Sequence, residues 1–152
     1  MEIRPAEPMD FVTLTQKGRE VHEAMEYARF LAYDEVGFQE MLMAMIERES
    51  SCLLIAWEGD EMAGAIGGAV RKNFYDTNQL IGSCAFYVVF REHQAKGHSK
   101  ALREAWEAWA VDRGADVIVY SPSNKTVIKM LERDGFEQIQ VSLMKRVGEE
   151  EA

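Results

Sequence analysis

Residues 86–102 read Phe-Tyr-Val-Val-Phe-Arg-Glu-His-Gln-Ala-Lys-Gly-His-Ser-Lys-Ala-Leu, and this stretch decides the fold that the sequence predicts. It begins with five apolar, β-prone residues, continues with polar residues and one glycine, and takes on a helical spacing of apolar residues from Ala101. We therefore predict a strand, a short loop and a helix in direct succession. The first backbone N–H groups of such a helix are unpaired and lie at the positive end of its dipole, which suits a bound anion.

Hydrophobic periodicity predicts further helices and strands on both sides of this stretch. Before it, we predict a strand over 2–5, helices from Phe11 and from Phe38 to about Glu49, hairpin strands over 52–57 and 62–70, and a strand over 81–90. After it, we predict a helix over 99–113, a strand over 116–121, a helix over 124–134 and two short strands within 136–147. The strand–helix–strand succession makes the strands over 81–90 and 116–121 parallel, through a right-handed crossover.

The chain has 152 residues and a formal net charge of −9. This length fits one domain, which we place at 1–148, followed by a frayed acidic tail over 149–152. The negative charge argues against nucleic acid or an anionic membrane as the partner, because both would repel the protein. We expect a cytoplasmic protein, since the sequence contains neither a run of about 20 apolar residues nor a signal-like opening. Cys52 and Cys84 are then expected to be free thiols.

The loop sequence resembles a motif of a known family. Gln94-Ala95-Lys96-Gly97-His98-Ser99 is similar to the pyrophosphate loop of the GCN5-related N-acetyltransferases, which has Gln or Arg, then Gly three positions later, then Gly or Ala two positions after that. Ser99 departs from the family at the last of these positions. A second segment supports the resemblance, because Asn124 and the pair Gly135-Phe136 match the family's pattern over its last helix. The opening residues 3–6 and the turn over 58–61 also look like the family.

This resemblance implies a particular fold and a particular co-substrate. The fold is α/β (α+β), with a mixed, mostly antiparallel sheet of about six or seven strands, flanked by about four helices and splayed between two central parallel strands. The co-substrate is acetyl-CoA. No metal is implied, and the three histidines have no metal-ligand spacing. The residues that the resemblance places against acetyl-CoA, by backbone or side chain, are Val88, Phe90, Gln94, Ala95, Lys96, Gly97, His98, Ser99, Lys100 and Asn124.

The acceptor site has fewer signals. In the resembled family the segment between the first two helices borders this site, so Tyr33 and Asp34 are candidate substrate contacts. The alternative is that the aromatic residues of this segment only complete the core. Tyr75, in the polar loop over 71–79, and Ser121 are further candidates. That loop could equally pack on a neighbouring subunit.

No catalytic residue can be assigned from the sequence. Members of the family often carry a carboxylate on the strand before the loop, and a tyrosine on the last helix that protonates the departing thiolate. Here residues 83–87 contain no carboxylate, and Leu131 stands at the position of the tyrosine. Glu92 and His93 follow the strand at loop positions that normally face solvent.

Two functions remain open at this level. The first is an N-acetyltransferase that moves an acetyl group from acetyl-CoA to a primary amine of a small molecule or peptide, with water relaying the proton of the amine. The alternative is a catalytically degenerate module that has kept the coenzyme pocket for binding or assembly. A homodimer is compatible with both, although no residue demands one.

Overall fold

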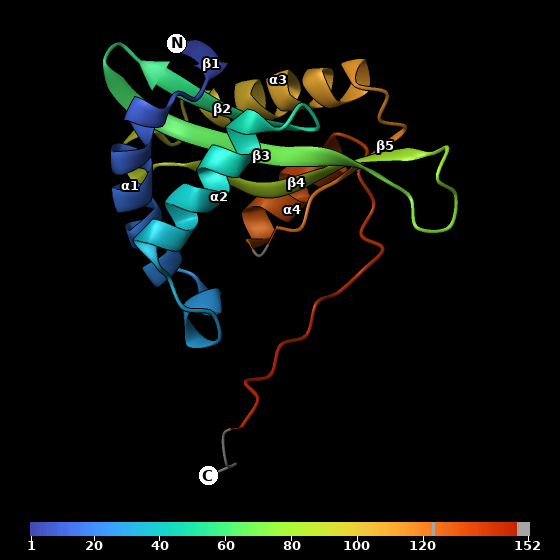
Figure 1. Cartoon of the computed structure of the whole chain (residues 1–152). Coiled ribbons are helices and arrows are strands. Elements are labelled where there is room, and N and C mark those ends of the chain that lie inside the picture. Colours follow the sequence, from blue (N-terminus) through green and yellow to red (C-terminus); the bar gives the residue numbers. More distant parts are fainter. Residues whose placement is uncertain (123, 149–152) are drawn as a thin grey trace.

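The computed structural model describes residues 1–122 and 124–148, and Figure 1 shows how they are arranged. Five strands form one sheet in the order β1-β2-β3-β4-β5. Their bounds are β1 Glu2–Pro5, β2 Ser51–Glu58, β3 Glu61–Lys72, β4 Leu80–Val89 and β5 Val117–Val119. Neighbouring strands from β1 to β4 are antiparallel, whereas β5 runs parallel to β4. The expected mixed, mostly antiparallel sheet is confirmed.

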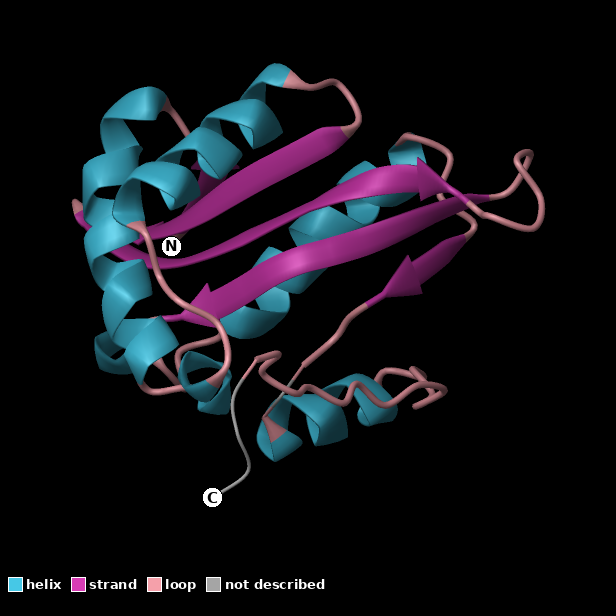
Figure 2. Ribbon diagram, turned by 60° about the horizontal axis from the view of Figure 1, so that its bottom comes forward, coloured by secondary structure: helices cyan, strands magenta, loops and turns pink. Residues whose placement is uncertain are grey.

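Helices lie on both faces of this sheet (Figure 2). Their bounds are α1 Phe11–Glu23, α2 Glu35–Glu47, α3 His98–Asp112 and α4 Lys125–Arg133. Successive residues of β2 point to opposite faces and so belong to two separate cores. Leu53 and Ile55 pack in the cluster that contains residues of α1 and α2, while Leu54 and Ala56 pack in the cluster of α3. Within the described residues, no helix has both the length and the apolar character needed to span a bilayer.

The helix α2 begins earlier than the sequence predicts. Periodicity places its start at Phe38, but the helix starts at Glu35, directly after Asp34. The carboxylate of Asp34 accepts a hydrogen bond of 3.1 Å from the backbone N–H of Gly37 and so caps the first turn. Capping, rather than the apolar stripe, fixes this end of the helix.

Two glycines of β3 allow other elements to approach its backbone closely. A Cβ added at Gly64 would lie 2.5 Å from the carbonyl oxygen of Val88 on β4. A Cβ at Gly68 would lie 2.3 Å from the carbonyl oxygen of Ser83 and 2.6 Å from the ring of Trp106 on α3. Such contacts are too short for a side chain, so glycine is required where α3 and β4 pack against β3.

The two short strands predicted within 136–147 are wrong, and the sheet has five strands instead of six or seven. Residues 137–146 form neither helix nor strand, and every residue from 137 to 148 is exposed. In Figure 1 this segment leaves the body as an extended coil. The apolar alternation is present in the sequence, but a strand also needs a neighbouring edge for its backbone hydrogen bonds, and within the described part of the chain residues 137–146 pair with none.

Candidate active site

The parallel strands β4 and β5 separate soon after they meet. Their pairing joins Ile81 to Val117, Gly82 to Ile118 and Ser83 to Val119. Close to the end of this pairing, the register between β3 and β4 shifts at Gly67/Gly68 and leaves Ala85 without an opposite residue, which is a bulge in β4. Because the pairing with β5 ends at Ser83, the edge of β4 beyond it is free of strand pairing within the described residues. Because β4 and β5 separate after Val119, β5 ends there and is shorter than the strand predicted over 116–121.

A cavity of about 600 Å³ occupies this opening. One wall comes from β4, through Cys84 to Val88 and Phe90, and from the chain after β5, through Tyr120 to Pro122. The opposite wall comes from α1, α2 and the segment between them. It includes Val21, His22, Met25, Leu31, Phe38 and Met41. The cavity thus connects the opening between β4 and β5 with the segment between α1 and α2, which contains the candidate substrate contacts Tyr33 and Asp34.

The loop before α3 has a backbone suited to an anion. Ala95 adopts a φ of +64° and Gly97 a φ of +86°, and Gly97 is the N-cap of α3. Residues with positive φ alternating with ordinary ones turn backbone N–H groups toward one side, and such concave loops bind phosphate. No side chain caps the first turn of α3, and a Cβ added at Gly97 would meet no atom within 4 Å. Gly97 itself is exposed, so the entrance to the first turn of α3 is open on the side of this residue.

The side chains of this loop serve several purposes. Gln94 donates through Nε2 to the carbonyl oxygen of Val89 at 3.3 Å, so it stabilises the loop entrance. The hydroxyl of Ser99 contacts that of Tyr87 on β4. Lys100 lies 3.8 Å from Glu104 one turn further along α3, with both side chains mostly exposed. Lys96 is exposed.

His93 and His98 are buried, contrary to the expectation that His93 faces solvent. Nε2 of His93 lies 3.2 Å from Glu61, and Nε2 of His98 lies 2.9 Å from Glu58. The two imidazole rings are 5.9 Å apart. No local pattern in the sequence predicts this arrangement, because both glutamates come from the hairpin between β2 and β3, which is distant along the chain. The side chain of His98 therefore anchors the loop.

The pairing with β3 decides which backbone groups of β4 face the opening, since alternate residues use opposite edges. The N–H of Phe90 donates to the carbonyl oxygen of Ala63 at 2.8 Å, and the carbonyl of Val88 points toward Gly64. Both groups face β3. The free edge belongs to Tyr87 and Val89, so the sequence-based choice of Val88 and Phe90 as backbone contacts is displaced by one residue. Val88 and Phe90 nevertheless line the cavity.

The remaining predicted residues divide into two groups. Tyr33, Asp34, Ser121 and Asn124 all line the cavity, whereas Tyr75 is 92% exposed on the loop between β3 and β4 and does not. Asn124 also caps α4, accepting a hydrogen bond of 2.7 Å from the N–H of Thr126.

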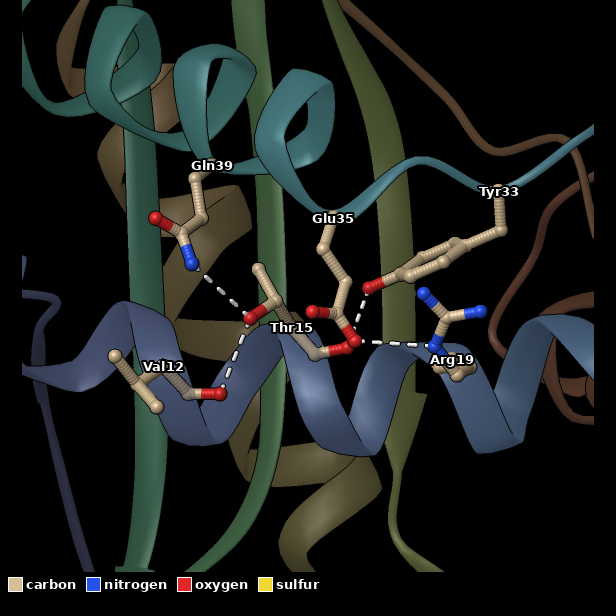
Figure 3. Close-up of polar contacts among 6 residues, drawn as sticks. All are labelled: Val12, Thr15, Arg19, Tyr33, Glu35 and Gln39. Carbon is tan, nitrogen blue, oxygen red and sulfur yellow. Dashed lines mark hydrogen bonds and ion pairs between the residues drawn. The ribbon is translucent and has the colours of Figure 1, made fainter.

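The segment before α2 is tied to α1 by several polar contacts (Figure 3). The hydroxyl of Tyr33 donates to the carbonyl oxygen of Thr15, and Nε of Arg19 donates to Glu35 at 3.0 Å. These contacts fix the ring of Tyr33 in the cavity wall and commit its hydroxyl to the backbone of α1. Asp34 is the only carboxylate among the described lining residues, and these include no Lys or Arg.

Tyr87 and Tyr120 also line the cavity. Neither phenol is predicted from the sequence to act in catalysis. Burial raises the pKa of Tyr87 above its ordinary value. Burial also raises the pKa of Tyr120, and so does its hydrogen bond of 2.8 Å to the carboxylate of Glu107 on α3. Both phenols are therefore protonated at neutral pH, and Tyr120 donates its single O–H to Glu107.

These features define an α/β protein with an opened parallel strand pair, a loop whose backbone is suited to an anion at the start of a helix, and a mostly apolar cavity. The chain belongs to the acetyltransferase (GNAT) family, whose family model matches residues 17–136. The resemblance seen in the sequence is thereby confirmed. A search of curated proteins found no match to this chain.

Several solved structures share the fold. An acetyltransferase from Trypanosoma brucei superposes with a TM-score of 0.75 at 16% identity, covering 96% of this chain and 99% of the other. An aminoglycoside antibiotic 6'-N-acetyltransferase from Acinetobacter haemolyticus gives 0.72 at 14% identity, covering 97% and 99%. Glucosamine-6-phosphate N-acetyltransferase from Arabidopsis thaliana gives 0.76 at 13% identity, covering 96% and 97%. At such identities the likeness concerns the fold alone.

Proposed function

We propose that this protein transfers the acetyl group of acetyl-CoA to the primary amine of a small molecule with an apolar body. The main support for the proposal is that one cavity extends from the opening beside β4 to the wall formed by α1 and α2. A donor that enters between the strands and an acceptor that rests on the helices would meet inside it. Holding two reactants in contact supplies much of the rate of such a transfer.

The residues at the donor end fit acetyl-CoA, which would supply the acetyl thioester. The N–H groups of Gly97, His98 and Ser99 bind the two phosphates, and the exposed ammonium groups of Lys96 and Lys100 add positive charge. The space open beside Gly97 is what lets phosphate oxygens approach the backbone.

Backbone groups on the free edge of β4 hold the rest of the donor. Tyr87 and Val89 offer their N–H and carbonyl groups to the amides of the pantetheine arm, as a neighbouring strand would. Close to the bulge at Ala85, the N–H of Tyr87 donates to the thioester carbonyl and stabilises the charge that develops on its oxygen.

The wall opposite β4 indicates the acceptor class. Its side chains are largely apolar, with Met25, Phe38 and Met41 among them, and Asp34 supplies the only negative charge of the described lining. An apolar amine fits this combination, because its body packs on the apolar wall and its ammonium group pairs with Asp34. The phosphate of an amino sugar phosphate would find no Lys or Arg here, and a polycationic aminoglycoside would find one carboxylate only.

The chain's own groups have limited roles in proton transfer. The phenols of Tyr87 and Tyr120 stay protonated at neutral pH and so cannot act as bases, and Tyr120 donates its O–H to Glu107. Water near Ser121 and Asp34 carries one proton of the ammonium group to solvent before the amine attacks. When the tetrahedral intermediate collapses, the C–S bond breaks, the product nitrogen loses its second proton to water, and the departing CoA thiolate is protonated from water.

The alternative, a binding module without catalysis, rests on two observations: Leu131, buried in α4, occupies the position of the family's tyrosine, and residues 83–87 carry no carboxylate. Calorimetry with acetyl-CoA and CoA, combined with release of free thiol in the presence of an amine panel, separates the two. Binding with turnover supports the enzyme, and binding without turnover on any amine supports the module. No binding at millimolar acetyl-CoA would overturn both.

A further inference from the structure

The nine methionines of the chain differ widely in their exposure to solvent. Met62 is buried in the core, and Met43 and Met45 pack against the same cluster. Four other methionines are exposed, and these are Met1, Met9, Met41 and Met144. The oxidation of a thioether depends on its exposure, so these four are the methionines that a mild oxidant reaches first.

Met41 is the one exposed methionine among the described residues that line the cavity. It follows Phe38, another lining residue, by three positions on α2, and residues at this spacing are neighbours on a helix surface. Leu42, the next residue, is buried, whereas Met41 is 63% exposed. Met41 therefore lies at the rim of the cavity, where the inner side of α2 meets solvent. Met25, the other methionine of this wall, is only partly exposed.

Oxidation changes the chemical character of this rim. Hydrogen peroxide transfers one oxygen atom to the thioether, so that the O–O bond breaks, an S–O bond forms, the sulfur loses two electrons and the peroxide leaves as water. The sulfoxide oxygen is a hydrogen-bond acceptor that is costly to remove from water. The side chains of Val21, Leu31 and Phe38 in the same wall contain no donor for it. An apolar ligand that packs there loses part of its contact.

The donor end of the site is built from other elements. The groups that we assign to acetyl-CoA lie on β4 and in the loop before α3, whereas Met41 belongs to the wall formed by α1, α2 and the segment between them. An oxygen atom added at Met41 therefore acts on the acceptor and leaves the groups that hold the donor in place. The expected signature is a higher KM for the acceptor with an unchanged dissociation constant for acetyl-CoA.

We propose that Met41 is a site of reversible oxidation, and that its sulfoxide weakens binding of the acceptor amine. Peroxide converts an apolar contact at the cavity rim into a polar one. A methionine sulfoxide reductase reverses the change, because a dithiol takes up the oxygen as water and becomes a disulfide while the thioether is restored. The inference rests on the proposed function, since it requires the body of the acceptor to pack on the wall that contains Met41.

Limited treatment of the full chain with hydrogen peroxide, followed by peptide mass spectrometry, measures the sulfoxide at each methionine. Met9 and Met41 should be oxidised and Met62 should not, and hexylamine, a primary amine with an apolar body, should protect Met41 but not Met9. Release of free thiol from acetyl-CoA then gives the KM for hexylamine. This KM should rise at least about threefold on oxidation and return to its first value after treatment with methionine sulfoxide reductases A and B.

Two leucine substitutions assign the effect to one residue. Met41→Leu, whatever its own KM, should have the same KM before and after peroxide, whereas Met9→Leu should respond as the wild type does. This comparison also separates Met41 from Cys84, whose thiol lines the same cavity.

The outcomes distinguish this inference from the proposed function. Turnover of hexylamine with a KM that peroxide leaves unchanged, or an equal rise in KM for Met41→Leu and the wild type, would refute the role of Met41 and leave the proposed function intact. If hexylamine neither binds in calorimetry nor reacts, the apolar acceptor and the role of Met41 are both wrong.

Discussion

His98 at the start of α3 and Glu58 at the end of β2 hold the loop that precedes α3, residues 91–97, against the hairpin formed by β2 and β3. Nε2 of His98 lies 2.9 Å from Oε1 of Glu58, and the imidazole is fully buried. This is a close polar contact, although it does not meet the criteria for a hydrogen bond. The buried imidazole and the loop backbone that would bind phosphate belong to the same residue, so the position of one determines the position of the other.

His98→Ala should therefore affect both stability and binding. Loss of a buried side chain and of its contact lowers the free energy of unfolding by about 1–3 kcal/mol. The loosened loop should also raise the dissociation constant for acetyl-CoA several-fold. Chemical denaturation and calorimetry measure the two effects. Val111→Ala, at an exposed position of the same helix, is the control and should change stability by less than about 0.5 kcal/mol. If His98→Ala and Val111→Ala had the same stability and the same affinity for acetyl-CoA, the contact between His98 and Glu58 would have no role in either property.

The left-handed backbone at Gly97 gives a second prediction. Alanine at a φ of +86° is strained, so Gly97→Ala should cost about 1 kcal/mol of stability, and its methyl group should lower acetyl-CoA affinity by entering the phosphate site. Gly59 in the β2–β3 turn has a φ of +57° and equally open surroundings, which makes Gly59→Ala a matched control. It should show a similar loss of stability with unchanged affinity. If Gly97→Ala binds acetyl-CoA as the wild type does, the phosphates lie elsewhere.

Asp34 can be changed without loss of the helix cap. Asparagine caps a helix as well as aspartate does, so Asp34→Asn removes only the negative charge. For an apolar primary amine, we expect KM to rise about tenfold or more, since a charge-assisted contact is lost. The dissociation constant for acetyl-CoA should stay the same. Glu40→Gln, exposed on the same helix, is the control in steady-state kinetics. An unchanged KM for Asp34→Asn would exclude Asp34 from the acceptor site.

The two half-buried cysteines predict a dependence of stability on alkaline pH. Burial raises the pKa of Cys52 to about 11 and that of Cys84 to about 12, from an ordinary 9.0. Folding therefore favours the protonated thiols. Their contribution is complete below about pH 9 and is lost as the pH rises toward 11–12. Urea midpoints between pH 8 and 11 measure the loss. A chain with Cys52→Ala and Cys84→Ala should show a smaller decrease, and an identical decrease would mean that other groups cause it.

Local features of the chain follow from sequence because their causes are local. The strand, loop and helix around residues 86–102 depend on side-chain period and on one glycine at the helix start, and the structure has all of them. The gathering of Tyr33, Asp34, Ser121 and Asn124 at one cavity was also anticipated in part, since the family's fold implies it. The burial of His93 and His98 was not, because the glutamates that receive them come from a hairpin more than thirty residues earlier.

The sequence by itself determined where β4 ends, where α3 begins and which backbone N–H groups are left free between them, because each of these depends on neighbouring residues. Only the tertiary structure decided that Tyr87 and Val89, rather than Val88 and Phe90, face the opening, since the pairing with β3 selects which edge of a strand is free. It also decided that residues 137–146 are not a strand in the isolated chain. An alternating pattern encodes a face, but a strand exists only where another backbone completes its hydrogen bonds.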